Sequence, residues 1–391
     1  MTSSREIFPH PPELLTNGSP ESMSEHCCTH SPVLCVLPPF ILERIAQLGS
    51  SVQRQWAQRA LLVSERLRGQ RDSTSVLAGL ALTPVGEKRR TIYDARGTDA
   101  LPGRRIRSEG EPPTGDIAAD EAYDGAGETF DLYFECFGRN SLDDRGLRLD
   151  STVHYSHSFD NAFWNGAQMV YGDGDMDLPE AERLFNRFTI SVDIIGHELT
   201  HGLTQHEANL LYMHQPGALN EHMSDVFGSL VKQRRLRQTA READWLIGEG
   251  LFTAQVNAVA IRSLKAPGTA YDDKLLGKDP QPGHMRDYLK LRLWEDNGGV
   301  HLNSGIPNRA FYVVAHELGG HAWERAGRIW YYTLRDRLRR NSNFNHCARM
   351  TWLVAAELFG EGSVEQKAVE TGWHEVGINC RNPLLDFVGI E

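Results

Sequence analysis

The spacing of apolar residues differs between the two halves of the chain. After residue 190, apolar side chains recur every three or four positions, a period typical of helices with one buried face. The helices predicted on this basis are 191–207, 218–233, 304–318, 325–339 and 348–359. Between residues 90 and 190, Gly and Pro separate short β-prone runs, which predict strands, and one further helix is expected over 117–137. These runs include 91–93, 152–155 and 169–171. The pattern predicts an α+β fold in which a β-rich part precedes a mainly helical part.

The first ninety residues follow another pattern. Residues 1–32 are polar, rich in Ser, Pro and His, and without periodicity, so we expect a flexible leader. A helical hairpin follows, whose first helix has apolar residues at Ile41, Leu42, Ile45 and Leu48. Gly49 ends that run, and Ser50 or Ser51 can cap the second helix. Residues 69–89 mix Gly, Arg, Asp, Ser and Thr, and we interpret them as a linker that proteolysis could cut.

Composition narrows the class of protein. The 391 residues leave room for two or three domains, and 52 acidic against 41 basic side chains give a net charge of −11. Such a balance gives no electrostatic reason to bind nucleic acid. No run approaches the roughly 18 apolar residues of a membrane helix, so no membrane partner is expected. The six cysteines lack the spacing of a disulfide framework, and no secretory signal peptide is recognised at the N-terminus.

The strongest local signal for chemistry is the run His197-Glu198-Leu199-Thr200-His201 within a predicted helix. Histidines four residues apart lie on one helix face, so both imidazoles can bind one zinc ion, with Glu198 beside an attacking water. The alternative is a solvent-exposed helix face on which the same residues have no function.

A catalytic zinc ion takes three protein ligands, so a third ligand must come from elsewhere. Glu221, on the next predicted helix in the run GALNEHMSDVFG, is the candidate. Asp225 lies four residues later on the same face, where it can accept the second ring hydrogen of a histidine ligand. Considered alone, Glu221 would be an ordinary carboxylate on a helix surface.

Several separated blocks together resemble the thermolysin family of zinc endopeptidases. They are NAFWNGAQMVYGDGD from Asn161, HELTHGLT from His197, GALNEHMSDVFG from Gly217 and DNGGVHLNSGIPN from Asp296, with FGRNSLDD from Phe137 and Ile261-Arg262-Ser263 in addition. These blocks cover most of residues 90–391. The resemblance implies a two-domain peptidase, with the HExxH helix between a β-rich N-terminal and a mainly helical C-terminal catalytic domain.

The resemblance also implies a role for each matching residue. The zinc ligands would be His197, His201 and Glu221, and Glu198 would be the general base. His301 and Tyr212 would bind the developing oxyanion, with Asp296 orienting the histidine. The substrate main chain would be held by Asn161, the carbonyl of Ala162 and Arg262. The pocket for the residue after the scissile bond would consist of Phe185, Ile194, Ile247, Leu251 and Ile261. Without the resemblance, His301 would be an isolated loop histidine and Arg262 a charge at a helix end.

The chain departs from the family pattern where calcium is expected. Asp193, Asp244 and Glu249 match carboxylates of a calcium site near the active site, but Lys232 and Leu246 stand where two others are expected. An ammonium group beside three carboxylates replaces a cation and does not ligate one. Val259 occupies the carboxylate position of a further calcium loop. Calcium as a cofactor is therefore doubtful.

The segment before the hairpin, Cys35-Val36-Leu37-Pro38-Pro39-Phe40, is similar to the short prosegment of the protealysin-like subgroup. That similarity implies a leader and prosegment over 1–88, followed by catalytic domains over 89–205 and 206–391. Prolines lack amide donors, so this segment could lie in the active site and resist cleavage. The thiolate of Cys35 could in addition bind the zinc ion. A disordered tail with one amphipathic hairpin is the alternative.

The resulting prediction is a zinc-dependent neutral endopeptidase that cleaves on the N-terminal side of bulky hydrophobic residues and is made as a latent zymogen. Its partners would be protein or peptide substrates and its own prosegment, and we expect a monomer. The protein would be secreted without a recognisable signal peptide, or cytoplasmic. The alternatives are a thermolysin-like protein that acts mainly by binding, and a zinc amidase that acts on small molecules.

Overall fold

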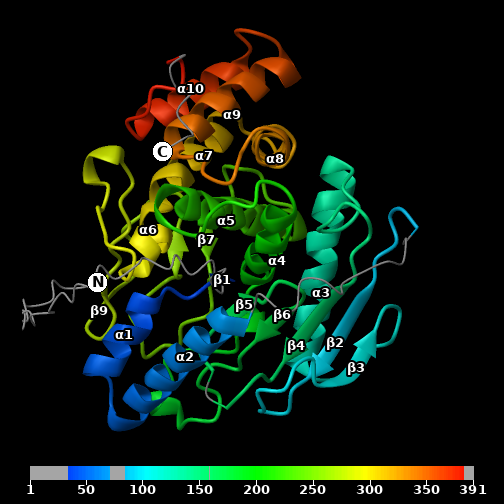
Figure 1. The fold of residues 1–391 in the computed structure, drawn as a ribbon, viewed down its shortest axis with the longest axis vertical. Helices are drawn as coiled ribbons and strands as arrows, with labels where there is room; N and C mark the ends of the chain where they lie inside the picture. The colour runs from blue at the N-terminus through cyan, green and yellow to red at the C-terminus, as the bar shows by residue number, and fades with distance from the viewer. Residues whose placement is uncertain (1–33, 71–83, 158, 383–391) are drawn as a thin grey trace, which may run out of the picture.

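The computed structural model describes residues 34–70, 84–157 and 159–382. The leader predicted over 1–32 and most of the predicted linker lie outside these ranges. Figure 1 shows a twisted sheet with helix α3 beside it, a central pair of helices α4 and α5, and a group of helices α7–α10 at the far end. The combination of a β-rich part and a helical part confirms the predicted α+β class.

The main sheet has six strands in the order β1-β5-β6-β4-β2-β3. Their bounds are Leu34–Cys35 (β1), Arg90–Asp94 (β2), Arg104–Ser108 (β3), Leu149–Val153 (β4), Ala162–Trp164 (β5) and Met169–Tyr171 (β6). The pairs β2–β4 and β4–β6 are parallel, and the others are antiparallel. The predicted strand over 152–155 ends two residues early, because His154 has a left-handed φ of 54° that interrupts the extended chain.

Strand β1 comes from the segment that precedes the predicted linker, yet it forms the edge of the main sheet. It pairs antiparallel with β5, with Leu34 opposite Trp164 and Cys35 opposite Phe163. The two helices that follow are α1 (Pro39–Leu48) and α2 (Ser51–Gln70), as the apolar pattern predicted. Ser50 and Gln53 exchange hydrogen bonds between side chain and backbone, which caps α2.

Helices α4 (Val192–His206) and α5 (His214–Leu236) form the centre of the molecule. Their backbones lie so close that a Cβ added at Gly228 would come within 2.4 Å of the Asp193 carbonyl oxygen. Helix α3 (Ile117–Asp131) packs on α4 and continues as a π-helical turn over Leu132–Cys136, so the predicted helix 117–137 is regular only in its first part. Helix α5 begins four residues before its predicted start, because Pro216 is tolerated in a first turn.

The C-terminal part consists of α6 (Asp296–Asn303), α7 (Gly305–Leu318), α8 (Ala326–Asp336), α9 (Phe344–Phe359) and α10 (Val364–Glu375). The prediction omitted α6 and α10 and ended α8 three residues too late. Helix α6 has no regular apolar period because residues 297–299 have left-handed φ angles of 50° to 86°. Helix α9 starts four residues before the prediction because the Asn343 side chain caps it by accepting from the His346 amide.

Short elements lie between the longer ones along the chain. Strands β7 (Leu246–Ile247) and β8 (Arg262–Ser263) form one antiparallel pair, and β9 (Asp272–Asp273) and β10 (Gly277–Lys278) form another. Within the described residues, short 3₁₀ turns span Glu180–Glu182, Phe188–Ile190 and Met285–Asp287. Over the ranges that the structure describes, none of the helices is both long and apolar enough to span a membrane.

Candidate metal and active site

Three buried side chains from α4 and α5 converge on one point. His197 and His201 lie one turn apart on α4, and Glu221 faces them from α5. The Nε2 atoms of the two histidines are 3.1 Å apart, and Glu221 oxygens lie 3.5 Å from His197 Nε2 and 3.4 Å from His201 Nε2. All three side chains are fully buried, and their ligand atoms lie within 4.8 Å of one another.

The partners of the two rings show which nitrogen faces this point. His197 Nδ1 lies 2.8 Å from Asp225 Oδ1, and His201 Nδ1 lies 2.8 Å from Asn220 Oδ1. Because these oxygens accept hydrogen bonds, each Nδ1 carries the proton and each Nε2 presents a lone pair. Two lone pairs 3.1 Å apart, beside a buried Glu221 oxygen without a hydrogen-bond partner in the described part of the chain, repel one another unless a cation lies between them. Two imidazoles and one carboxylate suit zinc, with a fourth position left open.

Asp225 connects this group to the rest of the site. Besides His197, its carboxylate accepts from Arg262 Nε at 2.9 Å, from Arg262 Nη2 at 2.8 Å and from Asn308 Nδ2 at 2.8 Å. Burial favours the neutral acid, but Arg262 and His197 hold the pKa of Asp225 well below its usual range. Arg262 lies on strand β8. The interpretation of Arg262 as a charge at a helix end, which applied without the family resemblance, is therefore wrong.

Glu198 lies beside the two histidines on α4 and is fully buried. One carboxylate oxygen accepts from the Trp164 amide of strand β5 at 2.9 Å, while Oε1 has no hydrogen-bond partner among the described residues. Burial raises the pKa of Glu198 well above its usual range, and the charge of Glu221 raises it further. The carboxyl group is therefore fixed through one oxygen, and the other oxygen can accept a proton.

His301, Tyr212 and Asp296 lie on the other side of the three converging side chains. His301 Nε2 is 3.1 Å from the Tyr212 hydroxyl, which donates to Glu221 Oε1. Asp296 accepts from His301 Nδ1 at 2.5 Å and from the His301 amide at 2.9 Å. Burial disfavours the charged imidazole, but Glu221 and Asp296 outweigh it and raise the pKa of His301 to about 9. The left-handed turn at the start of α6 brings Asp296 back against His301.

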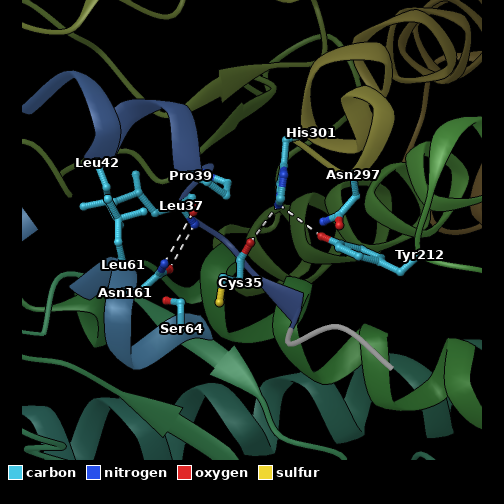
Figure 2. Close-up of a pocket in the computed structure, with 10 residues that line it drawn as sticks. All are labelled: Cys35, Leu37, Pro39, Leu42, Leu61, Ser64, Asn161, Tyr212, Asn297 and His301. Carbon is cyan, nitrogen blue, oxygen red and sulfur yellow. Dashed lines mark hydrogen bonds between the residues drawn. The ribbon is translucent and has the colours of Figure 1, made fainter. Parts of the chain in front are cut away.

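Residues 35–37 lie across this site, as Figure 2 shows. The Cys35 carbonyl oxygen is 3.0 Å from His301 Nε2, and the Val36 carbonyl accepts from Arg262 Nη1 at 2.9 Å. The Val36 amide donates to the Ala162 carbonyl at 3.3 Å. Leu37 is bound twice by the Asn161 side chain, at 3.1 Å through its amide and at 3.4 Å through its carbonyl. Among the described residues, the group of potential metal ligands does not include the sulfur of Cys35.

The residues expected to form the apolar pocket come from four separate parts of the chain. All five are at most 1% exposed: Phe185, Ile194, Ile247, Leu251 and Ile261. Ile261 donates its amide to the Ile247 carbonyl at 2.9 Å, and Leu251 accepts from the Asn186 amide at 2.7 Å.

Lys232 lies where a calcium site was considered. Its Nζ atom is 2.7 Å from Asp244 and 2.9 Å from Glu249, and 3.5 Å from Asp193. Burial disfavours the charged ammonium group, but the three carboxylates raise the pKa of Lys232 above its ordinary value. The ammonium group therefore supplies positive charge between these carboxylates.

Three side chains that contribute to the site were absent from the prediction. Asn220 and Ser224 both contact His201 Nδ1, at 2.8 Å and 3.0 Å. Their spacing of four residues, next to Glu221 and Asp225, was a usable signal for a second polar row on α5. Asn308, on α7, has no local signal of this kind, because only the tertiary fold brings it to Asp225.

Comparison with known families identifies two adjoining matches. The catalytic-domain model of thermolysin metallopeptidases matches residues 87–205, and the alpha-helical-domain model matches residues 208–378. Together the two matches span more than half of the chain.

Individual metalloproteases are similar to this chain in sequence and in structure. The chain is 50% identical over 361 residues to an extracellular metalloprotease of Pectobacterium carotovorum subsp. carotovorum, covering 90% of this chain and 99% of that protein. It is 52% identical over 293 residues to the protease PrtS of Photorhabdus sp. (strain Az29), covering 75% and 77%. A solved structure of the precursor of protealysin, a metalloproteinase from Serratia proteamaculans, superimposes with a TM-score of 0.79 at 50% identity, covering 88% of this chain and 99% of that one.

Proposed function

Because this chain belongs to the thermolysin family of metallopeptidases and is a metalloendopeptidase, we propose that it cleaves peptides before bulky hydrophobic residues and is made as a latent zymogen. The observation that carries the catalytic part is the buried group of His197, His201 and Glu221, with Glu198 beside it, whose Oε1 has no hydrogen-bond partner among the described residues. The domain limits proposed are a prosegment up to residue 88, a catalytic domain over 89–205 and a second over 206–391.

In the proposed mechanism His197, His201 and Glu221 hold zinc. Bound there, zinc would polarise the scissile carbonyl and acidify water. Glu198 accepts the proton of the attacking water and later gives it to the leaving amine, while the Trp164 amide fixes the orientation of its carboxyl group. His301 and Tyr212 donate hydrogen bonds to the developing oxyanion, a kind of interaction worth roughly 3 to 4 kcal/mol per donor.

The substrate main chain is held along strand β5 and by Arg262. Asn161 and the Ala162 carbonyl pair with the peptide after the scissile bond, and Arg262 donates to the carbonyl of the first residue after that bond. The five apolar residues described above form the pocket for the side chain of that residue. Their complete burial supports a preference for Leu, Phe or Ile there.

The prosegment already occupies these positions, which supports latency. Its Cys35 carbonyl lies at His301, where a scissile carbonyl would lie, and Val36 and Leu37 take the hydrogen bonds proposed for substrate. Residues 38 and 39 are prolines and lack amide donors. These contacts support steric blockage by the backbone. Coordination of zinc by the Cys35 thiolate remains a separate hypothesis.

Location, partners and cofactors are part of the proposal. The relative from Pectobacterium carotovorum is described as an extracellular metalloprotease, which favours secretion over a cytoplasmic location. We propose that protein or peptide substrates and the prosegment are its partners, and that it acts as a monomer. Calcium is not expected as a cofactor, because Lys232 is bonded to the candidate carboxylates.

Casein hydrolysis by protein that lacks residues 1–88 tests the catalytic proposal. Activity should be abolished by a zinc chelator and restored by added zinc. Absence of activity in the zinc-loaded protein would refute the proposal.

Latency is tested by comparing the full-length protein, Cys35→Ser and the shortened protein, with Glu198→Gln versions to exclude contaminating protease. Full-length protein as active as the shortened one before any cleavage would refute latency. A Cys35→Ser protein that stays fully latent would refute only the role of the thiol.

A further inference from the structure

We propose that Lys232 is a positioning residue for substrate selection: its ammonium group holds the loop over residues 244–251 against helix α4 and so fixes the shape of the apolar pocket. This inference rests on the proposed function, because it concerns the pocket for the residue after the scissile bond. Lys232 would then position the loop in addition to replacing a cation between the three carboxylates.

The contacts of Lys232 join three parts of the chain. The residue lies near the C-terminal end of α5 and is only 7% exposed. Its Nζ donates to Asp244 Oδ2 at 2.7 Å and to Glu249 Oε2 at 2.9 Å, both on the loop. It also lies 3.5 Å from Oδ2 of Asp193, a fully buried residue in the first turn of α4. One cation thus connects α5, α4 and the loop.

Two of these carboxylates also bind the loop backbone on either side of Ile247. Asp193 Oδ1 accepts from the Gly248 amide at 2.9 Å. Asp244 Oδ1 accepts from the Leu246 amide at 2.9 Å. The position of Ile247 therefore depends on carboxylates whose other oxygens face Lys232.

The pocket side chains would follow any movement of this loop. The Ile247 carbonyl accepts from the Ile261 amide at 2.9 Å. Gly248 has a φ of 78°, and a Cβ there would lie 2.8 Å from Ile261 Cδ1, so loop and pocket wall are in tight contact. Leu251, which ends the loop, accepts from the Asn186 amide at 2.7 Å. A displaced loop would enlarge or distort the pocket.

Removal of the ammonium group would favour such a displacement of the loop. Three carboxylates would then face one another, and Asp193 Oδ2 has no hydrogen-bond partner in the described chain apart from its ion pair with Lys232. Like charges at this distance repel, and the repulsion is strongest for the fully buried Asp193, because water partly screens Asp244 and Glu249. A cavity of about 220 Å³, lined by Lys232 and Glu249 among others, lies beside the cluster and gives the loop space to move.

The test compares full-length wild-type protein, Lys232→Met and Lys232→Arg, each activated by limited trypsin cleavage in the linker over 69–89. kcat and KM are measured for two peptides that differ only in Leu or Ala after the scissile bond. For Lys232→Met we expect KM for the Leu peptide to rise and the Leu/Ala ratio of kcat/KM to fall roughly tenfold. Lys232→Arg should keep most of the ratio. Lys367→Met, an exposed lysine on α10, is the matched control and should leave the ratio unchanged.

The outcomes separate this inference from the proposed function. A wild-type preference for Leu that Lys232→Met retains would overturn the positioning role and leave the proposed function intact. A wild-type enzyme without preference for Leu would overturn the proposed specificity, and this inference with it. If circular dichroism shows that Lys232→Met does not fold, Glu249→Gln replaces it, because that carboxylate is about half exposed. An unchanged Leu/Ala ratio in Glu249→Gln would likewise overturn the inference.

Discussion

Replacement of Val36 by Glu should activate the full-length protein before any cleavage. Val36 is fully buried, and its amide and carbonyl are bound by Ala162 and Arg262. The new carboxyl group would replace a side chain that is fully buried, where a charge without a partner is costly. The segment therefore gains stability by leaving the site, and the site becomes available to substrate.

The expected size of the activation follows from the burial of the Val36 side chain. Burying a valine side chain is worth about 1.5 to 3 kcal/mol, and burying a carboxyl without a partner costs at least a similar amount. A loss of about 3 kcal/mol raises the population of the open form on the order of a hundredfold. Initial rates on a fluorogenic peptide, with gel analysis to show that the chain is intact, measure this change.

The matched control is Val85→Glu, because Val85 is 78% exposed and the same substitution should there leave latency unchanged. Val36→Ile should also remain latent, since it keeps an apolar side chain. If Val36→Glu is as inactive as the wild type while the shortened protein is active, the reasoning about the blocked site is wrong.

The catalytic base, the apolar pocket, the Lys232 cluster and His154 can each be tested separately. Glu198→Gln should abolish proteolysis while zinc stays bound, which metal analysis together with an activity assay would show; an empty site or undiminished activity contradicts it. Product mapping on a peptide library should find cleavage before Leu, Phe or Ile, and a preference for charged residues would refute the pocket assignment. Millimolar calcium should barely change the melting temperature, because Lys232 occupies the cluster; a steep rise would show that a calcium site survives. Finally, Asp173 and Asp116 raise the pKa of His154 to about 9 despite its partial burial, so its contribution to stability is complete below about pH 6.5 and is lost as pH rises through 9. Denaturant unfolding of the wild type and of His154→Asn is measured from pH 6 to 10. The free energies of unfolding of the two proteins should differ by about 2 kcal/mol at pH 6, and this difference should vanish at high pH. A difference that is constant over this pH range would contradict the prediction.

Local spacing predicted the parts of the site that lie on single helices. His197, Glu198 and His201 could be placed because a four-residue spacing determines a helix face, whatever the rest of the fold. Glu221 and Asp225 share a helix in the same way. By contrast, Arg262 lies on a strand, His301 on a distorted helix and Asn161 directly before strand β5, and only tertiary folding brings them together. For these residues, resemblance to a family supplied what periodicity could not.

The elements that were missed or misplaced have specific physical causes. The start of α6 has left-handed backbone angles that apolar periodicity does not encode. The pairing of β1 with β5 joins residues about 130 positions apart, and β1 has only two residues, too few for a recognisable alternation. Its position was therefore expected only from the similarity to a short prosegment.

Strand β5 has a consequence for how broadly the enzyme can act. It is the edge strand of the catalytic sheet once β1 is set aside, and main-chain hydrogen bonds join it to the segment that covers it. Addition of a strand to a sheet edge binds any extended chain, because amides and carbonyls are the same in every sequence except at proline. Such pairing requires an extended backbone and does not depend on which side chains the bound segment has. An enzyme built on this edge would therefore act first on unfolded or mobile segments of proteins, and the conformation of a target would limit its cleavage more than its sequence.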